Sequence, residues 1–513
     1  MRQFQVARLA RVPFPIMDWT TVIWLACYLV VFVGLTSYGI HRYCVLYLYF
    51  RHSRNRPEPA RRFADLPVVT VQLPIFNEVH VIRRLLDKVS ALDYPKDRLQ
   101  IQILDDSTDE TREVCAAEAD RLRRLGFDVE HRHRTDRTGF KAGALEAGLA
   151  SAKGEFLFIL DADFVPPPDI LHRMVHFFTD GKIGMIQTRW GHLNRNVSLL
   201  TRVQAMFLDG HLLLEQTARS RSGRFFNFNG TAGIWRKSCI LDSGGWEHDT
   251  LTEDMDLSYR AQLKGWRFVF LNDVVTPAEL PMDMDGFKSQ QHRWTKGSIQ
   301  TCKKILGRIW LSDFPLLIKL EATVHLTSNF AYLLLIFLCV YTLPFDPPGL
   351  PPGSGFWLGL PVFLIATVSL VIFYVTAQRA LNPKEWWKEL VYLPMLLALG
   401  IGMSINNGKA VLEALCNHQS GFVRTPKYGV GETAGGPIRS RSRTKALPMV
   451  LELVLGTWFF FLTVLAAMMG AWLTVPFLLL FVVGFYYCAG GSLLPTLFAS
   501  SRKDPEEFDA AVA

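Results

Sequence analysis

Apolar segments long enough to cross a lipid bilayer constrain this chain more than any other feature. A membrane-spanning helix needs about 20 apolar residues, and residues Trp19 to Tyr38 contain no charged side chain. Four further segments of this kind lie in the C-terminal half, at residues 325–342, 356–377, 447–469 and 473–493. Half of all residues are hydrophobic and yet 20% are charged, so the apolar residues are segregated. We therefore expect a membrane module joined to a soluble domain.

Basic residues beside these segments indicate the orientation of the chain. Arg51 and Arg54 follow the first segment, while Arg439 and Lys445 precede the last two. Basic loops stay in the cytosol, so an even number of crossings separates the two basic stretches. The first half of residues 390–416 is apolar and the second half carries polar residues. A full crossing there would make the number of crossings odd, so we predict an interfacial or re-entrant element. The prediction is five spans with a cytosolic C-terminus.

Charge and cysteine content exclude several classes of protein. The net charge is +8 and the pI is about 9.0, but the basic residues flank apolar segments or crowd the motifs described below. This distribution indicates membrane orientation and not nucleic-acid binding. The eight cysteines are scattered without a Cys-x-x-Cys pair, which predicts neither a disulfide framework nor a zinc site. No cleavable signal peptide is expected.

Residues 67 to about 280 alternate between short apolar runs and amphipathic stretches. Three apolar runs predict strands, at Val68–Leu73, Ile101–Leu104 and Phe156–Leu160. Residues 110–125 and 142–152 have the period of helices, with Thr108 or Asp109 as a candidate N-cap. Repeated strand–helix units predict a largely parallel sheet covered on both faces, whose ligands bind beyond the carboxyl ends of the strands.

Acidic residues fall at that edge of the predicted sheet. Asp105 and Asp106 follow one strand, and Asp161 and Asp163 follow another. Hard divalent cations bind carboxylate oxygens together with phosphates, so the second pair predicts a metal site for a diphosphate. The alternative for the first pair is a simple helix cap, and the alternative for the second pair is a solvated loop after a strand.

Two further motifs lie before the membrane segments. Asp254, in Thr252-Glu253-Asp254, offers a carboxylate that can accept a proton, although acids are also common at helix N-termini. Arg293 and Trp294, in Gln290-Gln291-His292-Arg293-Trp294, offer a guanidinium and an indole face, which suit phosphates and sugars. A tryptophan near a membrane can also be only an interfacial anchor.

Together these motifs resemble the signature of family 2 glycosyltransferases of the cellulose-synthase-like group, closest to the mannan/glucomannan synthase and cellulose synthase branch. The resemblance covers most of the chain. It implies an α/β fold plus membrane α-helices: a GT-A (Rossmann-like) cytosolic domain inserted between transmembrane helices. The implied divisions are an N-terminal span and basic linker (1–56), the catalytic domain (57–285), the QxxRW motif with interfacial helices (286–320), a transmembrane channel region (321–499) that includes a gating loop (417–445), and a cytosolic tail (500–513).

The resemblance also implies roles for individual residues. Asp254 would be the catalytic base, and Asp161 and Asp163 would hold Mg²⁺ or Mn²⁺. The residues implied to bind the donor nucleotide are Pro74, Asn77, Glu78, Asp105, Asp106, Lys141, Asp161, Asp163 and Arg293. The residues implied to bind the acceptor are Phe228, Asn229, Gly230, Thr231, Glu253, Gln290 and Trp294.

A late basic segment matches a further part of the same family. Phe422, Thr425 and Lys427 resemble the Phe-x-x-Thr-x-Lys gating loop of cellulose synthase, which closes over bound nucleotide; the alternative is an ordinary basic loop. Position 291 is Gln where bacterial cellulose synthases have Arg, a departure at a phosphate contact.

The implied activity is that of a processive inverting β-glycosyltransferase in a multi-pass membrane protein. It would take UDP-glucose or GDP-mannose and extend and translocate a β-linked glucan, mannan or glucomannan. A bacterial inner membrane or a Golgi membrane would suit it, and homo-oligomers or accessory subunits would be compatible. One alternative is a non-processive enzyme that acts on a lipid acceptor, and another is a transporter or scaffold that has lost activity.

Overall fold

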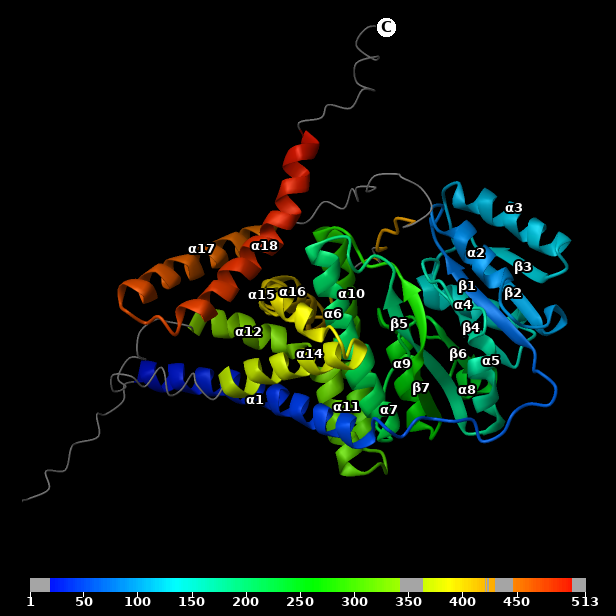
Figure 1. Cartoon of the computed structure of the whole chain (residues 1–513), viewed down its shortest axis with the longest axis horizontal. Helices are drawn as coiled ribbons and strands as arrows, with labels where there is room; N and C mark the ends of the chain where they lie inside the picture. Colours follow the sequence, from blue (N-terminus) through cyan, green and yellow to red (C-terminus); the bar gives the residue numbers. More distant parts are fainter. Residues whose placement is uncertain (1–18, 342–362, 420, 422–423, 430–445, 501–513) are drawn as a thin grey trace, which may run out of the picture.

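The computed structural model describes residues 19–341, 363–419, 421, 424–429 and 446–500. A sheet domain and a helical bundle lie side by side, with helices α10 (Met284–Trp310) and α11 (Leu316–Thr327) between them (Figure 1). The α/β domain and the apolar helices are thus segregated along the molecule, as the sequence predicts.

The sheet has seven strands in the order β3-β2-β1-β4-β6-β5-β7. Only β6 runs antiparallel to its neighbours β4 and β5, while all the other pairings are parallel. The prediction of a largely parallel sheet is therefore confirmed. The strands are β1 (Val69–Ile75), β2 (Leu99–Asp105), β3 (Asp128–His133), β4 (Phe156–Ile159), β5 (Ile183–His192), β6 (Gly233–Arg236) and β7 (Arg267–Ala278).

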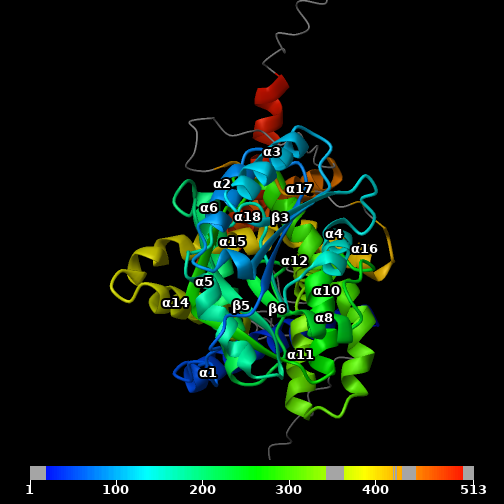
Figure 2. The ribbon, with the colours of Figure 1, turned by 90° about the vertical axis from the view of Figure 1, so that its right-hand side faces the viewer.

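Helices cover both faces of this sheet. Alternate residues of a strand point to opposite sides, so a strand that is apolar throughout needs a covering layer on each face. In β4, Phe156 and Phe158 join one buried apolar cluster, whereas Leu157 and Ile159 join the other. Figure 2 shows α2 and α5 on one side of the sheet and α4 and α8 on the other. The covering helices are α2 (Ile82–Ser90), α3 (Thr111–Arg124) and α5 (Ile170–Val175) on one face, and α4 (Phe140–Ser151), α8 (Lys237–Asp242) and α9 (Glu253–Leu263) on the other. Short 3₁₀ turns are η1 (Lys96–Arg98) and η2 (His176–Thr179).

The start of α3 differs from the prediction. Glu110 occupies the N-cap position and makes no side-chain cap, so Thr108 is not the cap. The Asp109 Oδ1 atom accepts a hydrogen bond from the Thr111 backbone N–H at 3.0 Å. A carboxylate one residue outside the N-cap thus satisfies one of the free N–H groups at this helix end.

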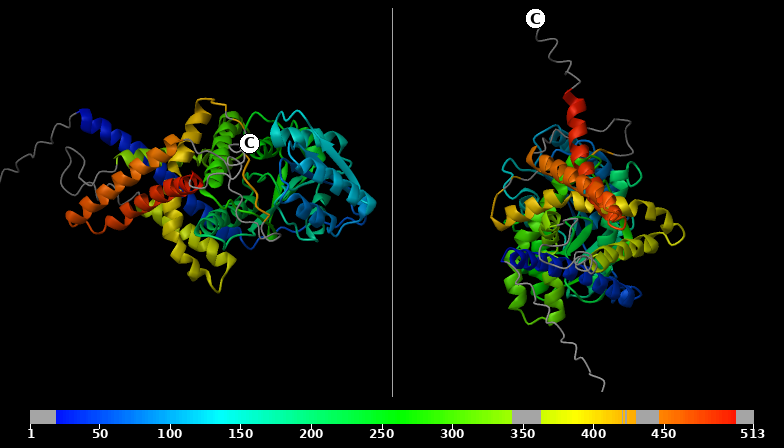
Figure 3. Two further views of the ribbon diagram at one scale, coloured as in Figure 1. Left: turned by 90° about the horizontal axis from the view of Figure 1, so that it is seen from above. Right: turned by 90° about the vertical axis from the view of Figure 1, so that its left-hand side faces the viewer.

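Within the part of the chain that the structure describes, five helical stretches are long and apolar enough to cross a membrane: Val22–His52, Leu364–Leu381, Trp386–Leu415, Ala446–Met468 and Val475–Leu494. Residues 316–327 and 330–340 pass the same test together but are bent by 59°. Seen from above, α17 and α18 extend away from the sheet domain (Figure 3). The elements outside the sheet domain's two layers, besides α10 and α11, are α1 (Trp19–His52), α6 (Leu199–Asp209), η3 (Gly210–Glu215), α7 (Gln216–Arg221), α12 (Phe330–Tyr341), η4 (Phe363–Thr367), α14 (Val368–Leu381), η5 (Trp386–Tyr392), α15 (Leu393–Gly402), α16 (Ser404–Leu415), α17 (Ala446–Met468) and α18 (Val475–Ser500).

Three membrane elements depart from their predicted outlines. Helix α1 continues past Tyr38 to His52, and its 34 residues span roughly 51 Å at 1.5 Å per residue, longer than a hydrocarbon core of about 30 Å. The segment predicted at 325–342 is not one straight helix, because the chain bends between α11 and α12. Residues 386–415 qualify as a span by length and composition. Figure 1 shows α16 end-on, whereas α1, α14 and α17 run lengthwise across the same view. The length test favours a span and the direction of α16 favours an interfacial element, so the assignment of residues 390–416 stays a prediction.

Candidate active site

A cavity of about 200 Å³ lies at the carboxyl end of the sheet, and we call it the donor pocket. Asp106, Asp163, Asp254 and Trp294, which come from four separate motifs, all line it. The motifs that the sequence places far apart therefore converge on one site. The predicted site residues in its wall are Pro74, Glu78, Asp106, Lys141, Asp161, Asp163, Asn229, Gly230, Glu253, Asp254, Gln290, Arg293, Trp294, Thr425 and Lys427.

Two predicted nucleotide-binding residues do not reach the donor pocket. Asp105 is fully buried, and its carboxylate binds His131 Nε2 at 3.0 Å and accepts the Ser107 backbone N–H at 2.8 Å. The Asn77 Oδ1 atom accepts the Thr108 backbone N–H at 2.9 Å. Both side chains instead hold the loops after β1 and β2 in place, because each accepts a backbone N–H of the loop after β2.

Two predicted acceptor-binding residues also lie behind the wall. Phe228 is fully buried and packs edge-on against Trp235. The Thr231 hydroxyl accepts the Asp161 backbone N–H at 2.8 Å, which fixes the loop that carries the predicted metal ligands. Phe422 lies outside the described residues.

Lysines neutralise both of the predicted metal ligands. Lys141 forms an ion pair with Asp161 and donates to the Gly230 carbonyl at 2.8 Å. Lys427 Nζ lies 2.7 Å from Asp163 Oδ1, and Asp163 Oδ2 accepts the Glu279 backbone N–H at 3.2 Å. Both carboxylates line the donor pocket just after β4, and carboxylate oxygens are ligands that Mg²⁺ and Mn²⁺ prefer, so the chemistry of these side chains fits the predicted metal.

Asp254 lies in the first turn of α9 beside Gly230. Its Oδ1 atom accepts the Met255 backbone N–H at 2.7 Å. Burial, followed by the charge of the neighbouring Glu253, raises the pKa of Asp254 to about 7. A carboxylate with a raised pKa is suited to accept a proton near neutral pH. Gly230 has φ +81°, and a Cβ there would lie 2.9 Å from Asp254 Oδ2, so only glycine leaves room for this carboxylate.

The described part of the predicted gating loop, residues 424–429, lies against the pocket. Arg424 binds both carboxylate oxygens of Glu78 at 3.0 Å and also donates to the Asn77 carbonyl. The Tyr428 backbone N–H donates to Glu279 Oε2 at 2.8 Å. Thr425 is buried in the same wall. These contacts bring together segments that are far apart in the sequence.

Sequence reasoning assigned no role to two arginines, one in the wall of the donor pocket and one that holds a wall residue. Arg137 lines that pocket and lies over the Phe76 ring, with its guanidinium carbon 3.2 Å from the ring centroid. Arg134 binds Asp106 through two contacts at 2.8 and 2.6 Å. Both arginines lie in the basic turn before Lys141, and this cluster of positive charge is the feature of the sequence that could have indicated a role at the site.

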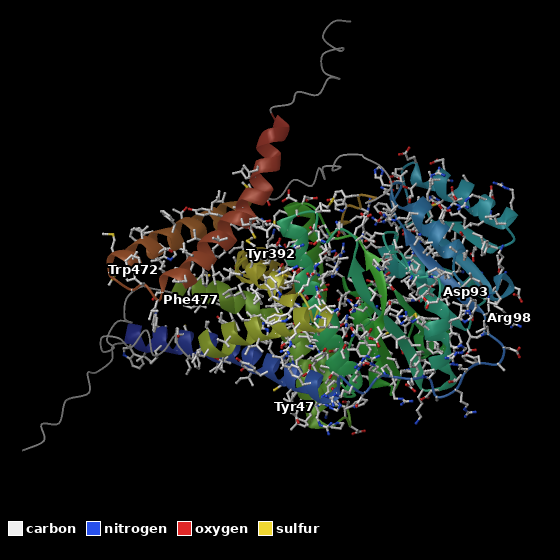
Figure 4. The ribbon with its side chains drawn as sticks, in the orientation of Figure 1. Tyr47, Asp93, Arg98, Tyr392, Trp472 and Phe477 are labelled. Carbon is white, nitrogen blue, oxygen red and sulfur yellow. The ribbon has the colours of Figure 1, made fainter. Side chains whose placement is uncertain are left out.

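A second cavity of about 540 Å³ continues from the donor pocket into the helical bundle, and we call it the tunnel. Helices α1, α10, α12, α14, α15 and α18 contribute to its wall. Figure 4 shows Phe477, one of the lining residues, within the bundle and well away from the sheet domain, with Trp472 further out at its tip. The residues that line both cavities are Trp190, Leu208, Asn229, Thr252, Asp254 and Trp294.

Helix α10 presents a different face to each cavity. Gln290 and Arg293 line the donor pocket, whereas Gln291 and Ser298 line the tunnel, and Trp294 lines both. This division follows from 3.6 residues per turn, which places positions 291 and 298 two turns apart on one face. Gln291 therefore lines the tunnel and not the donor pocket.

Comparison with known proteins places this geometry in a family. Residues 67–297 match the model of a family described as glycosyltransferase like family 2. The chain is 34% identical over 403 residues to glucomannan 4-beta-mannosyltransferase 7 of Arabidopsis thaliana, a match that covers 73% of this chain and 72% of that protein. It is 43% identical over 251 residues to probable glucomannan 4-beta-mannosyltransferase 6 of Oryza sativa subsp. japonica, a match that covers 48% of this chain and 44% of that protein.

A solved structure has a similar fold. It is the mannosyltransferase PcManGT from Pyrobaculum calidifontis in complex with GDP-Man and Mn²⁺, with a TM-score of 0.50 and 20% identity. The match covers 76% of this chain and 99% of that one. At this level of identity the likeness shows the fold alone.

Proposed function

Because the chain belongs to the cellulose-synthase-like glycosyltransferases of family 2, and is thus a hexosyltransferase, we propose that it is a processive inverting mannan or glucomannan synthase that uses GDP-mannose. One observation carries the proposal: Asp254 and Trp294 form a wall common to the donor pocket and the tunnel. A sugar joined to the acceptor at this wall has a protein-lined path into the membrane module.

The choice of donor rests on the relatives. The plant relatives are named as glucomannan mannosyltransferases, and PcManGT, which has a similar fold, was solved in complex with GDP-Man and Mn²⁺. UDP-glucose remains the competing donor, because the acidic and basic motifs of the pocket recognise a diphosphate and not a particular sugar.

On the donor side, Asp161 and Asp163 would hold the divalent metal, which when bound neutralises charge on the diphosphate. Lys141 and Arg293 line the same pocket and would stabilise the negative charge that develops on the departing nucleotide. Arg134 keeps Asp106 in position for the nucleoside, and Arg137 over Phe76 closes that side of the pocket.

On the acceptor side, Asp254 would remove the proton from the attacking hydroxyl. That oxygen then bonds to the anomeric carbon as the bond to the diphosphate oxygen breaks, which inverts the configuration. Trp294 would stack on the terminal sugar and set its hydroxyl beside Asp254. The transition state has oxocarbenium character, so the carboxylates of Glu253 and Asp254 also favour it electrostatically.

The basic stretches place the sheet domain in the cytosol under this proposal, with α10 and α11 at the membrane surface. The donor is then used on the cytosolic side and the product leaves through the bundle. Five crossings, with residues 390–416 at the interface, keep the basic stretches at residues 51–62 and 439–445 on the same side of the membrane.

Product size tests the function. Purified protein in detergent, supplied with Mn²⁺ and radiolabelled GDP-mannose or UDP-glucose, is expected to form a high-molecular-weight product from GDP-mannose that β-mannanase digests. A product limited to one sugar on a lipid would overturn the proposal and would support the lipid-acceptor enzyme. Asp254→Asn is expected to abolish the polymer, whereas unchanged turnover would favour the inactive-scaffold alternative.

A further inference from the structure

We propose that Gly297, Gln300 and Lys304 of α10 are positioning residues for the transfer reaction. They hold the loop at residues 247–252, which leads into α9, and through it they set the position of Asp254. None of the three lines the donor pocket or the tunnel, so each acts through the loop and not on the substrates. The inference rests on the proposed role of Asp254 as the base, and it adds residues that no motif of the sequence assigned.

The three residues continue the face of α10 that meets the donor pocket. Gln290 and Arg293 line that pocket, and positions 297, 300 and 304 follow Arg293 at spacings of three or four residues. Residues at such spacings are neighbours on one face of a helix. The same helix therefore carries Arg293 at the donor pocket and, further along, the residues that contact the loop.

The C-terminal end of the loop lies directly on α10. The Leu251 backbone N–H donates to Gln300 Oε1 at 2.9 Å. The hydroxyl oxygens of Thr252 and Thr301 are 3.2 Å apart. A Cβ on Gly297 would lie 2.5 Å from Thr252 Cγ2 and 2.8 Å from the Thr252 backbone nitrogen, so glycine is the residue that allows this close approach.

Lys304 holds the other end of the loop through a cluster of carboxylates. Its Nζ atom lies 2.7 Å from Asp249 Oδ1 and 3.1 Å from Asp256 Oδ1, and it also forms an ion pair with Glu247. Oxygens of the three carboxylates lie within 4.8 Å of one another, and the ammonium offsets their mutual repulsion. Because Asp256 follows Asp254 by two residues on α9, Lys304 ties both the loop and the helix to α10.

These contacts take the place of a cap at the start of α9. Thr252 occupies the N-cap position, but its side chain makes no cap hydrogen bond. A side-chain cap is a common way to fix the first turn of a helix, and Asp254 lies in that first turn. A shift of the loop away from α10 would therefore move the Asp254 carboxylate relative to the donor pocket.

Turnover measured beside nucleotide binding tests the assignment. Gly297→Ala and Lys304→Met are expected to lower the kcat for GDP release roughly 10- to 100-fold, since a displacement of about 1 Å in a reacting group can reduce turnover about 10²-fold. The KM for GDP-mannose and the affinity for GDP with Mn²⁺ are expected to stay within about twofold of the wild type, because the donor pocket is untouched. Lys304→Arg keeps the positive charge and is expected to restore most of the turnover.

Gly307→Ala and Arg308→Met are the matched controls. A Cβ on Gly307 meets no atom within 4 Å, and Arg308 is exposed one turn of α10 beyond Lys304. Replacing either glycine of α10 by alanine raises helix propensity, so only the contact with Thr252 makes Gly297→Ala harmful. Equal turnover within each pair of variants would overturn the inference.

The Asp254→Asn background separates positioning from a general loss of structure. If Lys304 acts through Asp254, adding Lys304→Met to Asp254→Asn should lower the residual GDP release by less than about twofold. A full additional loss in the double variant, or weaker GDP binding in the single variants, would overturn the inference. Should Lys304→Met fail to fold, Gln300→Met, which removes only the acceptor of the Leu251 N–H, carries the same test.

The size of the product is scored separately from GDP release. A wild type that makes only a single-sugar glycolipid would refute polymer synthesis, whereas the comparison of variants by GDP release would still decide the role of α10. Polymer synthesis by a wild type whose Gly297→Ala and Lys304→Met variants keep full kcat would uphold the function and refute the positioning role.

Discussion

Gly230 is the position where a single methyl group should impair catalysis most directly. In Gly230→Ala the new Cβ would lie 2.9 Å from Asp254 Oδ2 and 3.6 Å from Lys141 Nζ. The first distance is below normal contact, so the Asp254 carboxylate must move. Gly230 also has φ +81°, a left-handed conformation that costs other residues roughly 1–2 kcal/mol.

The two effects can be separated by assay. A displacement of about 1 Å in a reacting group can reduce turnover roughly 10²-fold, so we expect a loss of that order in the kcat for GDP release. The backbone strain should appear as a modest fall in the thermal unfolding temperature. Binding of GDP and Mn²⁺ should weaken much less than turnover, since the pocket's other groups remain.

Gly265→Ala is the matched control for Gly230→Ala. Gly265 follows α9 with φ +91°, and a Cβ there meets no atom within 4 Å. It therefore imposes the same kind of backbone strain without touching Asp254. Equal losses of turnover in the two variants would refute the role assigned to the Gly230–Asp254 contact.

Other perturbations follow from the same geometry. Asp254→Asn removes the base and should lower kcat by roughly 10²–10⁴-fold at unchanged GDP affinity, which nucleotide-release assays and calorimetry would measure; a loss under about tenfold would contradict this role. Burial and the charge of Glu253 raise the pKa of Asp254 to about 7, and only the ionised carboxylate accepts a proton. The kcat should therefore fall as the pH drops below about 7, and Asp254→Glu should change the pH at which this fall occurs. Chelation with EDTA should stop transfer, and Asp163→Asn should raise the Mn²⁺ concentration needed for half-maximal rate; an unchanged metal requirement would exclude Asp163 as a ligand. Asp105→Asn should reduce thermal stability and leave the donor KM nearly unchanged, because that carboxylate binds His131 and not the pocket.

Much of the site was accessible from sequence because strand ends in a parallel sheet share one edge. The runs ending near Asp106 and Asp161 identified two strand ends, and the sheet brings them together. The sequence could not separate Asp105 from Asp106. Neighbouring residues point to opposite sides, and only the fold shows that Asp106 lines the donor pocket while Asp105 binds His131 on β3.

Contacts between distant segments were beyond sequence reasoning. The pairing of Lys427 with Asp163 and of Arg424 with Glu78 depends on how the chain returns from the bundle to the sheet domain. The bend between α11 and α12 was equally hidden, since hydropathy measures length and composition but not direction. The two neighbouring faces of α10 could have been derived from the helical period, but which cavity each face meets required the fold.

Protection of the product inside sealed vesicles tests the central claim, that sugar added at the Asp254–Trp294 wall enters the tunnel. The protein would be reconstituted with its sheet domain outside and supplied with radiolabelled GDP-mannose and Mn²⁺, and β-mannanase would be added before or after detergent. We expect labelled polymer that resists the enzyme until detergent opens the vesicles. Polymer that β-mannanase removes completely from intact vesicles would contradict the claim.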